Sequence, residues 1–446
     1  MLNVIQTFPK GGVHPEENKF SAGSPIKVLP LPETVNIPLS QHIGTPSDPI
    51  VKKGDKVRTG QTIAKSKGFV SANIHSSVTG TVTKIDKLLD STGYKRMAIS
   101  ITTEEDHWEE SIDISNTINK TISAGPDEII RKTLDAGIVG LGGATFPSHI
   151  KLSVPKGKNA EVLIINGVEC EPCLTSDHRL MLEKGEELMV GIQLLMKALN
   201  VTRAIIGIES NKPDAIKHLS SLAAGYNGTS VSALKVKYPQ GGEKQLIKAL
   251  INREVPSGGL PVDVGALVHN VGTAFAVYEA VQKNKPLIER VVTVTGKELE
   301  NPCNFMVRIG TSVTDLVEAA GGLPKGTGKI INGGPMMGKA MNNLDVPVTK
   351  GTSGIVLIPY GESLRKPVIN CVRCAKCVNA CPMGLEPYLL MSATEYKKWE
   401  LVENERALDC MECGSCSYIC PSGRPLLDYI RLGKSTVSKI IRSKKE

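Results

Sequence analysis

The sequence predicts a multidomain α/β protein, and three observations support that prediction. The chain has 446 residues, more than a single hydrophobic core organises. Between about residues 120 and 287, apolar β-branched runs alternate with amphipathic helices, as in a Rossmann-like α/β domain. Two cysteine runs of identical spacing flank a helical segment near the C-terminus. We expect a β-rich domain over 1–110, the α/β domain over 120–287, a smaller strand-and-helix domain over 288–358, a helical cysteine-rich domain over 362–432 and a basic tail over 433–446.

The composition is that of a globular protein and excludes several functions. Hydrophobic residues make up 41% and charged residues 22% of the chain, which is ordinary usage. Aromatic residues make up only 4% and no basic motif with a matching fold occurs, so nucleic acid is not expected as a partner. No apolar run approaches the ~18 residues of a membrane-spanning helix, and the N-terminus lacks a signal-peptide pattern. We expect a cytoplasmic protein whose net charge of +8 suits an acidic partner or an anionic membrane surface.

The first domain is predicted to be a β barrel-sandwich. Residues 25–103 consist of short apolar and β-branched segments separated by Gly and Pro, without helical periodicity. The stretch VKKGDKVRTGQTIAKSKGFVSANIHSSVTGTVTKI resembles the biotinyl/lipoyl-carrier sandwich. That resemblance places Phe69 where a carrier domain has its modified lysine. A docking or scaffolding role is therefore expected, and a swinging arm is not.

Four loops of the α/β domain are expected to share one ligand pocket. The glycine-rich loop GLGGATFP (140–147) precedes the first strand, EVLIING (161–167), which runs into NGVECEPC (166–173). The stretches VKYPQGGEKQ (236–245) and ALVHNVGTAFAV (266–277) lie at further strand ends or helix starts. Ligands of parallel sheets bind at the carboxyl ends of the strands, and glycine-rich loops let backbone amides approach a phosphate. Taken singly, each loop is as well explained by a turn without a ligand.

The order of these motifs resembles a known flavoprotein family. G-x-G-G-A-x-F-P with Lys151, then N-x-x-E-x-E-P, Y-x-x-G-x-E and N-V-x-T, look like the flavoprotein subunit of respiratory complex I, which binds FMN and takes hydride from NADH. Over nearly the full chain, the domain order resembles RnfC, the NADH-oxidising peripheral subunit of Rnf complexes. The resemblance implies FMN contacts by Gly140, Gly142, Gly143, Lys151, Asn166, Glu169, Tyr238, Gly241, Glu243, Asn270 and Thr273. It implies nicotinamide-nucleotide contacts by Phe146 and Glu171, and it makes Glu243 and Glu171 the catalytic candidates.

The residue types at these positions suit the implied ligands. Asn and Glu direct hydrogen bonds to ribityl and ribose hydroxyls, and Lys151 and the loop amides suit a phosphate. The chain departs from the complex I pattern at Val168 and Gly242, where that pattern has acidic residues. It also departs at Val154 and Val255, where that pattern has aromatic residues that help to hold adenine. The departures affect the stacking of NADH more than the binding of the flavin.

The third domain is predicted from its position and from its order of elements. Residues 289–345 show a strand (RVVTVTG), a turn, a helix (TSVTDLVEAAGG) and a further strand (GKIINGG). In the families that the chain resembles, a β-grasp (SLBB) module follows the flavin domain, and the resemblance implies one over residues 288–358 here. We expect it to pack between the flavin domain and the cysteine-rich domain. Cys303 within it is expected to be a buried small apolar residue.

The two cysteine runs predict two [4Fe–4S] clusters. CVRCAKCVNACP (371–382) and CMECGSCSYICP (410–421) each have the spacing C-x2-C-x2-C-x3-C-P, in which the fourth cysteine ligates the other cluster. One cluster is therefore expected on Cys371, Cys374, Cys377 and Cys420, and the other on Cys410, Cys413, Cys416 and Cys381. The alternative, a pair of zinc sites, would place its C-x2–4-C pairs far apart. The connector between the runs has helical periodicity, so we expect a helical ferredoxin domain that passes single electrons.

A further cysteine pair lies in NGVECEPCLTSDHR (166–179). Alone, the spacing C-x-x-C with a following Asp177 and His178 suggests a metal site or a thioredoxin-type dithiol. The predicted clusters take their ligands elsewhere, however, and the same segment matches the flavin pattern N-x-x-E-x-E-P. We therefore expect Cys170 and Cys173 to be free thiols without a catalytic role.

The resemblance implies electron input to a membrane-associated, ion-translocating NADH:ferredoxin oxidoreductase. FMN would take hydride from NADH, and the two clusters would carry single electrons to the membrane-bound iron–sulfur and flavin subunits of an Rnf complex, with ferredoxin reached indirectly. Such a subunit is a translocase component, peripheral on the cytoplasmic side of the bacterial cell membrane. The basic tail RLGKSTVSKIIRSKKE is either solvated or attached to an anionic membrane surface.

Two alternative functions remain from the sequence. A cobalamin-reductase-type protein shares the flavin, β-grasp and two-cluster parts, but its flavin motif lies at the N-terminus, whereas here another domain precedes it. A non-catalytic electron-transfer scaffold would have the same domains with a degenerate flavin pocket.

Overall fold

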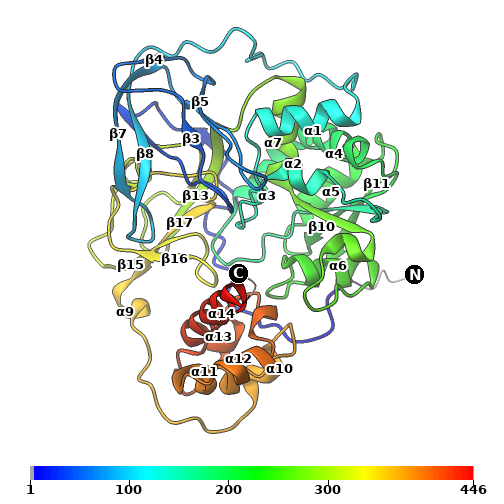
Figure 1. The fold of residues 1–446 in the computed structure, drawn as a ribbon, viewed down its shortest axis with the longest axis vertical. Helices are drawn as coiled ribbons and strands as arrows, with labels where there is room; N and C mark the ends of the chain where they lie inside the picture. The colour runs from blue at the N-terminus through cyan, green and yellow to red at the C-terminus, as the bar shows by residue number, and fades with distance from the viewer. Residues whose placement is uncertain (1–4, 445–446) are drawn as a thin grey trace.

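The computed structural model describes residues 5–444, which form a β sandwich, a parallel α/β domain, a mixed β-sheet domain and a helical domain (Figure 1). In this view the sandwich and the α/β domain lie side by side, and the helical domain lies below both of them. None of the described helices has the length and apolar character that a membrane crossing requires.

The β sandwich consists of one four-stranded and one three-stranded sheet, with strand orders β2-β8-β7-β4 and β3-β5-β6. Val35 and Ile37 of β2 pair with Ile101 and Ile99 of β8, and all four side chains are fully buried. This alternation gives each strand one apolar face, which packs against the other sheet. Phe69 is 80% exposed in the loop between β5 and β6. The strands are β2 Thr34–Pro38, β3 Asp48–Pro49, β4 Lys56–Val57, β5 Thr62–Lys65, β6 Ile74–His75, β7 Gly80–Leu89 and β8 Lys95–Thr103.

The α/β domain is built on a four-stranded, fully parallel sheet of order β11-β10-β9-β12. Its strands are apolar because helices cover them; on one side, α4 and α7 pack together and α4 buries Leu188, Ile192 and Leu195. The strands are β9 Val162–Asn166, β10 Ala204–Glu209, β11 Thr229–Leu234 and β12 Ala266–Asn270. The helices are α1 Pro126–Asp135, α2 Ser148–Leu152, α3 Ser176–Glu183, α4 Gly185–Leu199, α5 Pro213–Ala223, α6 Glu243–Ile251, the 3-10 helix Pro261–Val264 and α7 Val271–Gln282.

The third domain is a six-stranded mixed sheet of order β1-β14-β13-β17-β15-β16. Its edge strand β1 (Ile26–Val28) pairs in parallel with β14, although the sequence prediction assigned these residues to the N-terminal sandwich. The side chain of Asn304 on β14 explains the difference, because its Nδ2 donates to Ser21 O and Ser24 O and so holds the preceding turn on this sheet. The other elements are β13 Glu289–Gly296, β14 Cys303–Arg308, α8 Val313–Ala319, β15 Thr327–Asn332, β16 Lys339–Met341, β17 Gly354–Pro359 and α9 Tyr360–Ser363.

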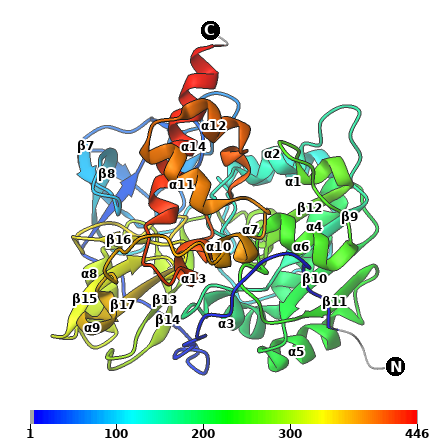
Figure 2. The ribbon, with the colours of Figure 1, turned by 90° about the horizontal axis from the view of Figure 1, so that it is seen from below.

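Residues 5–24, which we call the N-terminal strap, lie outside the sandwich and connect other domains. Val13 forms an antiparallel bridge with Tyr238 at the end of the α/β sheet. The neighbouring Gly12 N–H donates to Ala380 O of the helical domain at 2.9 Å. Figure 2 shows the strap, in dark blue, running across the α/β domain close to α10. The strap therefore joins the α/β domain to the helical domain.

The helical domain packs short helices and one long helix around the cysteine runs. Helix α14 is the longest of them and contacts α11 and α12. The basic tail expected from residue 433 is part of this helix as far as Ser443, because Val437 is buried against the domain. The elements are α10 Lys376–Ala380, α11 Pro387–Glu395, α12 Trp399–Asn404, the 3-10 helix Ala407–Asp409, α13 Ser415–Ile419 and α14 Leu426–Ser443.

Candidate functional site

The carboxyl ends of β9 and β12 bring three of the predicted loops together. Asn166 and Asn270 end these strands and are register partners. Asn166 Nδ2 donates to Gly241 O at 2.8 Å, which joins the first loop to the loop after β11. Asn270 Nδ2 donates to Asp177 Oδ2 at 2.7 Å, while its Oδ1 accepts from Gly272 N at 2.8 Å and caps α7. The side chains that sequence reasoning grouped by motif order are thus neighbours in space.

The glycine-rich loop completes this group at the N-terminus of α7. Leu141 N donates to the buried Thr273 Oγ1 at 2.9 Å, which holds the loop against the helix start. A Cβ at Gly142 would lie 3.3 Å from Asn270 Cβ, so this position has little room for a side chain. Gly143 has a φ of +117° and open space around it. Exposed amides beside a helix N-terminus form a cradle that suits a phosphate group.

Lys151 provides a positive charge beside this cradle. Its Nζ donates to Glu243 Oε1 at 2.6 Å and to Val268 O at 2.8 Å. The Lys151 side chain remains 28% exposed, so the pair is accessible from the pocket side. Gly140 N donates to Phe146 O at 2.9 Å and closes the glycine-rich loop, which leaves Phe146 half-buried. The charged pair and the loop amides are chemically suited to a phosphorylated, hydroxyl-rich ligand such as FMN.

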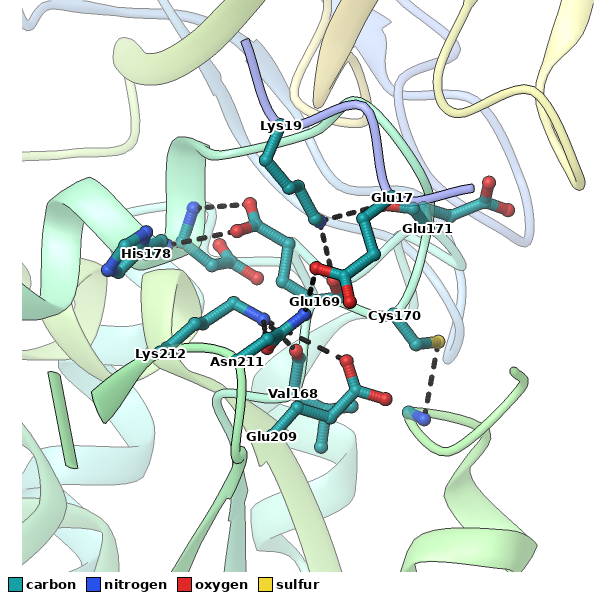
Figure 3. A network of polar contacts seen from close by, with 12 residues as sticks. Glu17, Lys19, Val168, Glu169, Cys170, Glu171, His178, Glu209, Asn211 and Lys212 are labelled. Atoms are coloured by element: carbon teal, nitrogen blue, oxygen red, sulfur yellow. Dashed lines mark hydrogen bonds and ion pairs between the residues drawn. The ribbon is translucent and has the colours of Figure 1, made fainter. Parts of the chain in front are cut away.

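Two lysines fix the loop that carries N-x-x-E-x-E-P (Figure 3). From the N-terminal strap, Lys19 Nζ donates to three carbonyl oxygens of the loop at 2.6 to 2.9 Å, which belong to Glu169, Glu171 and Leu174. Lys212 Nζ donates to Val168 O at 2.8 Å, and burial lowers the pKa of this lysine. The loop therefore keeps one backbone conformation whether or not its side chains bind a ligand.

Glu169 has a contact that the sequence reasoning did not foresee. Its carboxylate accepts hydrogen bonds from Asp177 N at 2.8 Å and His178 N at 3.2 Å and so caps α3. Burial, and then the neighbouring Glu169, raise the pKa of Asp177 to about 7. The sequence signal for Asp177 was its place in SDHR directly after the motif, but acidic residues at a helix start are common. The FMN contact of Glu169 stays a prediction.

Glu171 and Tyr238 lie where three domains meet. The Glu171 carboxylate accepts from Met336 N at 3.0 Å and Met337 N at 2.8 Å, in the turn between β15 and β16. Burial raises the pKa of Glu171 to about 7. Tyr238 is 2% exposed, and its hydroxyl donates to Cys413 O at 2.8 Å while lying 3.4 Å from Glu171 Oε1. Both predicted site residues therefore contact neighbouring domains, and the nicotinamide contact of Glu171 stays a prediction.

Four cysteines, which we call the inner thiol set, line one cavity of the helical domain: Cys381, Cys410, Cys413 and Cys416. The remaining wall of this cavity is largely apolar and includes Leu390 and Ile430. Burial, and then the three neighbouring thiols, raise the pKa of Cys416 to about 12. This set combines three cysteines of the second run with the last cysteine of the first run, as the ferredoxin pattern predicts.

The other four cysteines form the outer thiol set, Cys371, Cys374, Cys377 and Cys420. Cys371 and Cys374 are exposed, while Cys377 and Cys420 are half-buried. Burial raises the pKa of Cys377, and the neighbouring Cys420 raises it further, so the two cysteine runs approach each other here too.

The cysteine geometry fits clusters better than single metal ions. Within residues 5–444, no group of three or more His, Cys, Asp or Glu side chains is arranged to hold one metal ion. A [4Fe–4S] cubane needs its thiolates farther apart than one zinc ion does, and the inner thiol set surrounds a common cavity. The donor set therefore fits a cluster, although the ligation itself stays a prediction.

Cys170 and Cys173 do not form a site of their own. Both are free thiols in the structure. Cys170 Sγ accepts a hydrogen bond from Gly241 N at 3.3 Å, and Cys173 is buried beside Leu174 and Val356. Burial raises the pKa of both thiols, to about 11 for Cys173. They therefore pack as neutral groups behind the pocket loops.

Four family models match successive parts of the chain. They describe an RnfC barrel sandwich hybrid domain at residues 6–106, a Nuo51 FMN-binding domain at 133–279, an SLBB domain at 291–340 and a 4Fe-4S dicluster domain at 365–421. The matches confirm the expected fold class, including the β-grasp (SLBB) and two-cluster ferredoxin parts.

Curated relatives resemble the chain over almost its full length. The RnfC-type subunit of the proton-translocating ferredoxin:NAD(+) oxidoreductase complex of Clostridium ljungdahlii is 47% identical, over 97% of this chain and 94% of its own. Its counterpart in the Na(+)-translocating complex of Acetobacterium woodii is 42% identical, over 98% of both chains. The corresponding subunit of the ion-translocating oxidoreductase complex of Rhodobacter capsulatus is 40% identical, over 87% of this chain and 76% of its own. The chain therefore belongs to the RnfC family, whose members are subunits of ion-translocating ferredoxin:NAD(+) oxidoreductase complexes.

Proposed function

We propose that this chain is the electron-input subunit of an ion-translocating NADH:ferredoxin oxidoreductase. Family membership, the match to an FMN-binding domain and the convergence of the predicted pocket loops support this function. The observation that carries it is the hydrogen bond from Tyr238 Oη to Cys413 O, which joins a predicted flavin-loop residue to a predicted cluster ligand. A flavin pocket and a cluster site in direct contact are what two-electron to one-electron conversion requires.

The chain's own residues can hold the flavin. Bound FMN would accept hydride from NADH and release the electrons one at a time to [4Fe–4S] clusters. Gly142, Gly143 and Lys151 would hold its phosphate at the N-terminus of α7, and Glu243 would orient Lys151. Polar side chains around this cradle would bind the ribityl and ribose hydroxyls; the predicted set is Asn166, Glu169, Tyr238, Asn270 and Thr273. Phe146 and Glu171 are proposed to contact the nicotinamide nucleotide.

Contacts across the domain junction order the two thiol sets. A Cβ at Gly242 would lie 2.6 Å from Met411 Cε, so the loop after β11 touches the second cysteine run. Gln245 of α6 donates to Met383 Sδ at 3.3 Å, on the wall of the inner cavity. The inner thiol set therefore faces the flavin loops, and the outer thiol set is the exit. Electrons would leave this chain from the exposed end of the helical domain.

The partners that we propose are the other subunits of the complex. Membrane-bound iron–sulfur and flavin subunits would receive the electrons, with ferredoxin reached through them, on the cytoplasmic side of the bacterial cell membrane. The names of the relatives, as subunits of an ion-translocating complex, support this assignment.

The function is tested on protein purified without oxygen. Flavin extraction should release FMN, iron should be present, and NADH should reduce a viologen dye. Iron without FMN, together with no viologen reduction, would leave only the non-catalytic scaffold. Bleaching of the flavin by NADPH but not by NADH would overturn the choice of donor. Replacing Glu243 by Ala should slow flavin reduction and leave iron content unchanged; equal loss of iron would contradict the separate location of the two sites.

A further inference from the structure

The connection between α9 and α10 is exposed along its whole length. Every residue from Leu364 to Lys376 is exposed, and the segment ends inside the first cysteine run. Figure 1 shows this connection leaving α9 and running around the outside of the helical domain to α10. We call residues 364–376 the exposed run. A loop of this length without secondary structure is uncommon in a packed domain unless it serves a binding function.

The exposed run combines apolar side chains with positive charge. Four of its aliphatic side chains are 55% to 62% exposed, namely Leu364, Val368, Ile369 and Val372. Its charged residues are all basic, namely Arg365, Lys366, Arg373 and Lys376, and no Asp or Glu occurs from Ser363 to Leu385. Within residues 5–444, Arg365 pairs with Asp428 at 2.7 Å, and the other three basic residues make no ion pair. Clustered exposed aliphatic residues with cations at the edge are typical of a protein interface.

The exposed run is held beside the outer thiol set. Ile369 N donates to Ser422 O at 3.1 Å, and Ser422 Oγ donates to Asn370 O at 3.1 Å. A Cβ at Gly423 would lie 2.8 Å from Pro367 O, so the run lies close against the turn that follows Cys420. Cys371 and Cys374 belong to the run itself. The apolar and basic surface therefore surrounds the site from which electrons would leave.

We propose that the exposed run is the docking surface for the subunit that accepts electrons from this chain, and that this subunit presents carboxylates around an apolar contact next to its own iron–sulfur centre. This inference rests on the proposed function and adds the surface and its partner's chemistry. Opposite charges speed association and fix the orientation of the two proteins, and the aliphatic residues exclude water from the contact. Each docking passes one electron from the outer site to the partner's centre, so one hydride requires two transfers and no bond is made or broken.

A protein partner explains the exposed run better than a lipid surface does. Basic and aliphatic residues also occur in segments that bind anionic lipid. The run, however, contains two predicted cluster ligands, and a bilayer offers no electron acceptor at its headgroups. The segment is also an extended loop fixed to the turn at 422–423 and not an amphipathic helix. A partner with its own redox centre accounts for both features.

The test compares two double variants in membranes that contain the other subunits of the complex. Lys366→Glu/Val368→Asp changes the exposed run without touching a cysteine. Ile50→Asp/Lys52→Glu is the matched control, because it replaces the same residue types at exposed positions of the β sandwich. We expect the first variant to be retained on these membranes at least about tenfold less than the wild type, and the control to be retained normally. Iron content and NADH-to-viologen activity should stay unchanged in both.

Equal retention of the first variant and the wild type would overturn the proposal. So would loss of retention to the same degree on vesicles of phosphatidylglycerol that carry no subunits, because that result would make the run a lipid-binding segment. If the first variant lost its iron, a photoreactive residue at position 368 would decide. The proposal expects a cross-link to an iron–sulfur subunit there and none from position 50, and a cross-link to another subunit or to none contradicts it. Absence of viologen reduction in the wild type would instead count against the proposed function.

Discussion

The two cysteine runs share one spacing but lie in different surroundings. In the inner thiol set, Cys381, Cys413 and Cys416 are only 7% to 8% exposed, and the second run touches Tyr238 and Gly242 of the α/β domain. In the outer thiol set, Cys371 and Cys374 are exposed, and the loop that holds them is basic and apolar. The difference shows that spacing specifies the ligands of each cluster, whereas neighbouring domains set which cluster faces the flavin and which faces a partner.

The largest expected effect separates the flavin site from both cysteine runs. Lys151→Met removes the cation beside the phosphate cradle, and a charge-assisted hydrogen bond contributes about 1.5–3 kcal/mol. FMN affinity should therefore fall about 10- to 100-fold, measured by flavin content after dialysis, while iron stays at the wild-type level. Lys158→Met is the matched control, because Lys158 pairs with Asp263 at 2.8 Å elsewhere in the domain. Equal flavin loss in both variants would remove Lys151 from the site.

The next effect concerns the contact that distinguishes the inner thiol set. Tyr238→Phe removes the hydrogen bond to Cys413 O and leaves that buried carbonyl without its partner. At about 1 kcal/mol for such a bond, the docked arrangement should become about fivefold less favourable. The rate of cluster reduction after flavin reduction, followed by stopped-flow absorbance, should fall by a similar factor. Tyr278→Phe, at a buried tyrosine whose Oη accepts from Asn119 N, should leave that rate unchanged.

A pH effect is expected from Glu171, which ties the turn after β15 to the same junction. Its pKa is raised from 4.5 to about 7 by burial, against the opposing influence of the two amides and Lys19. Because the folded state holds this proton more tightly, the protonated carboxyl stabilises it fully below pH 4.5. That stabilisation is lost as the pH rises towards 7, at no more than ~1.4 kcal/mol per pH unit.

The Glu171 prediction is checked by thermal unfolding between pH 5 and pH 7.5. Glu171→Gln should flatten the decline of the unfolding temperature with pH, because an amide does not titrate. Glu400→Gln replaces an exposed carboxylate and should leave the decline as in the wild type. Identical slopes for the wild type and Glu171→Gln would show that this carboxyl does not titrate in that range.

The smallest expected effect tests whether a third cysteine pair matters. The double variant Cys170→Ser/Cys173→Ser should keep full NADH activity and normal flavin and iron content, since both thiols are neutral packing groups. A modest loss of thermal stability is expected, because Cys173 is buried among apolar side chains. An inactive protein with normal flavin content would restore a catalytic role for this pair.

Much of the fold could be predicted from the sequence because its local patterns are strong. The cysteine spacing, the alternation of strands and helices, and the motif order predicted the domain types that the family models confirm. The structure brings Asn166, Asn270 and Gly241 together, as the rule for parallel sheets predicts. Local patterning sufficed wherever a residue and its partners lie within one domain.

Contacts between domains could not be predicted in this way. Lys19 is a charged residue in a polar N-terminal stretch, and nothing near it in the sequence marks it as the donor to three carbonyls of a loop some 150 residues away. Strand β1 has only three residues, too few for a periodicity, and its partner β14 lies far along the chain. The position of Glu171 against Met336 and Met337 likewise depends on how two domains pack.

The most direct test of the order of the two thiol sets is stopped-flow reduction by NADH of two single-cluster variants, Cys374→Ala and Cys413→Ala. If the inner thiol set faces the flavin, the cluster that remains in Cys374→Ala should be reduced at the wild-type rate. The cluster that remains in Cys413→Ala should be reduced at least about tenfold more slowly, although the flavin is reduced normally in both variants. Fast reduction in Cys413→Ala together with slow reduction in Cys374→Ala would contradict the account.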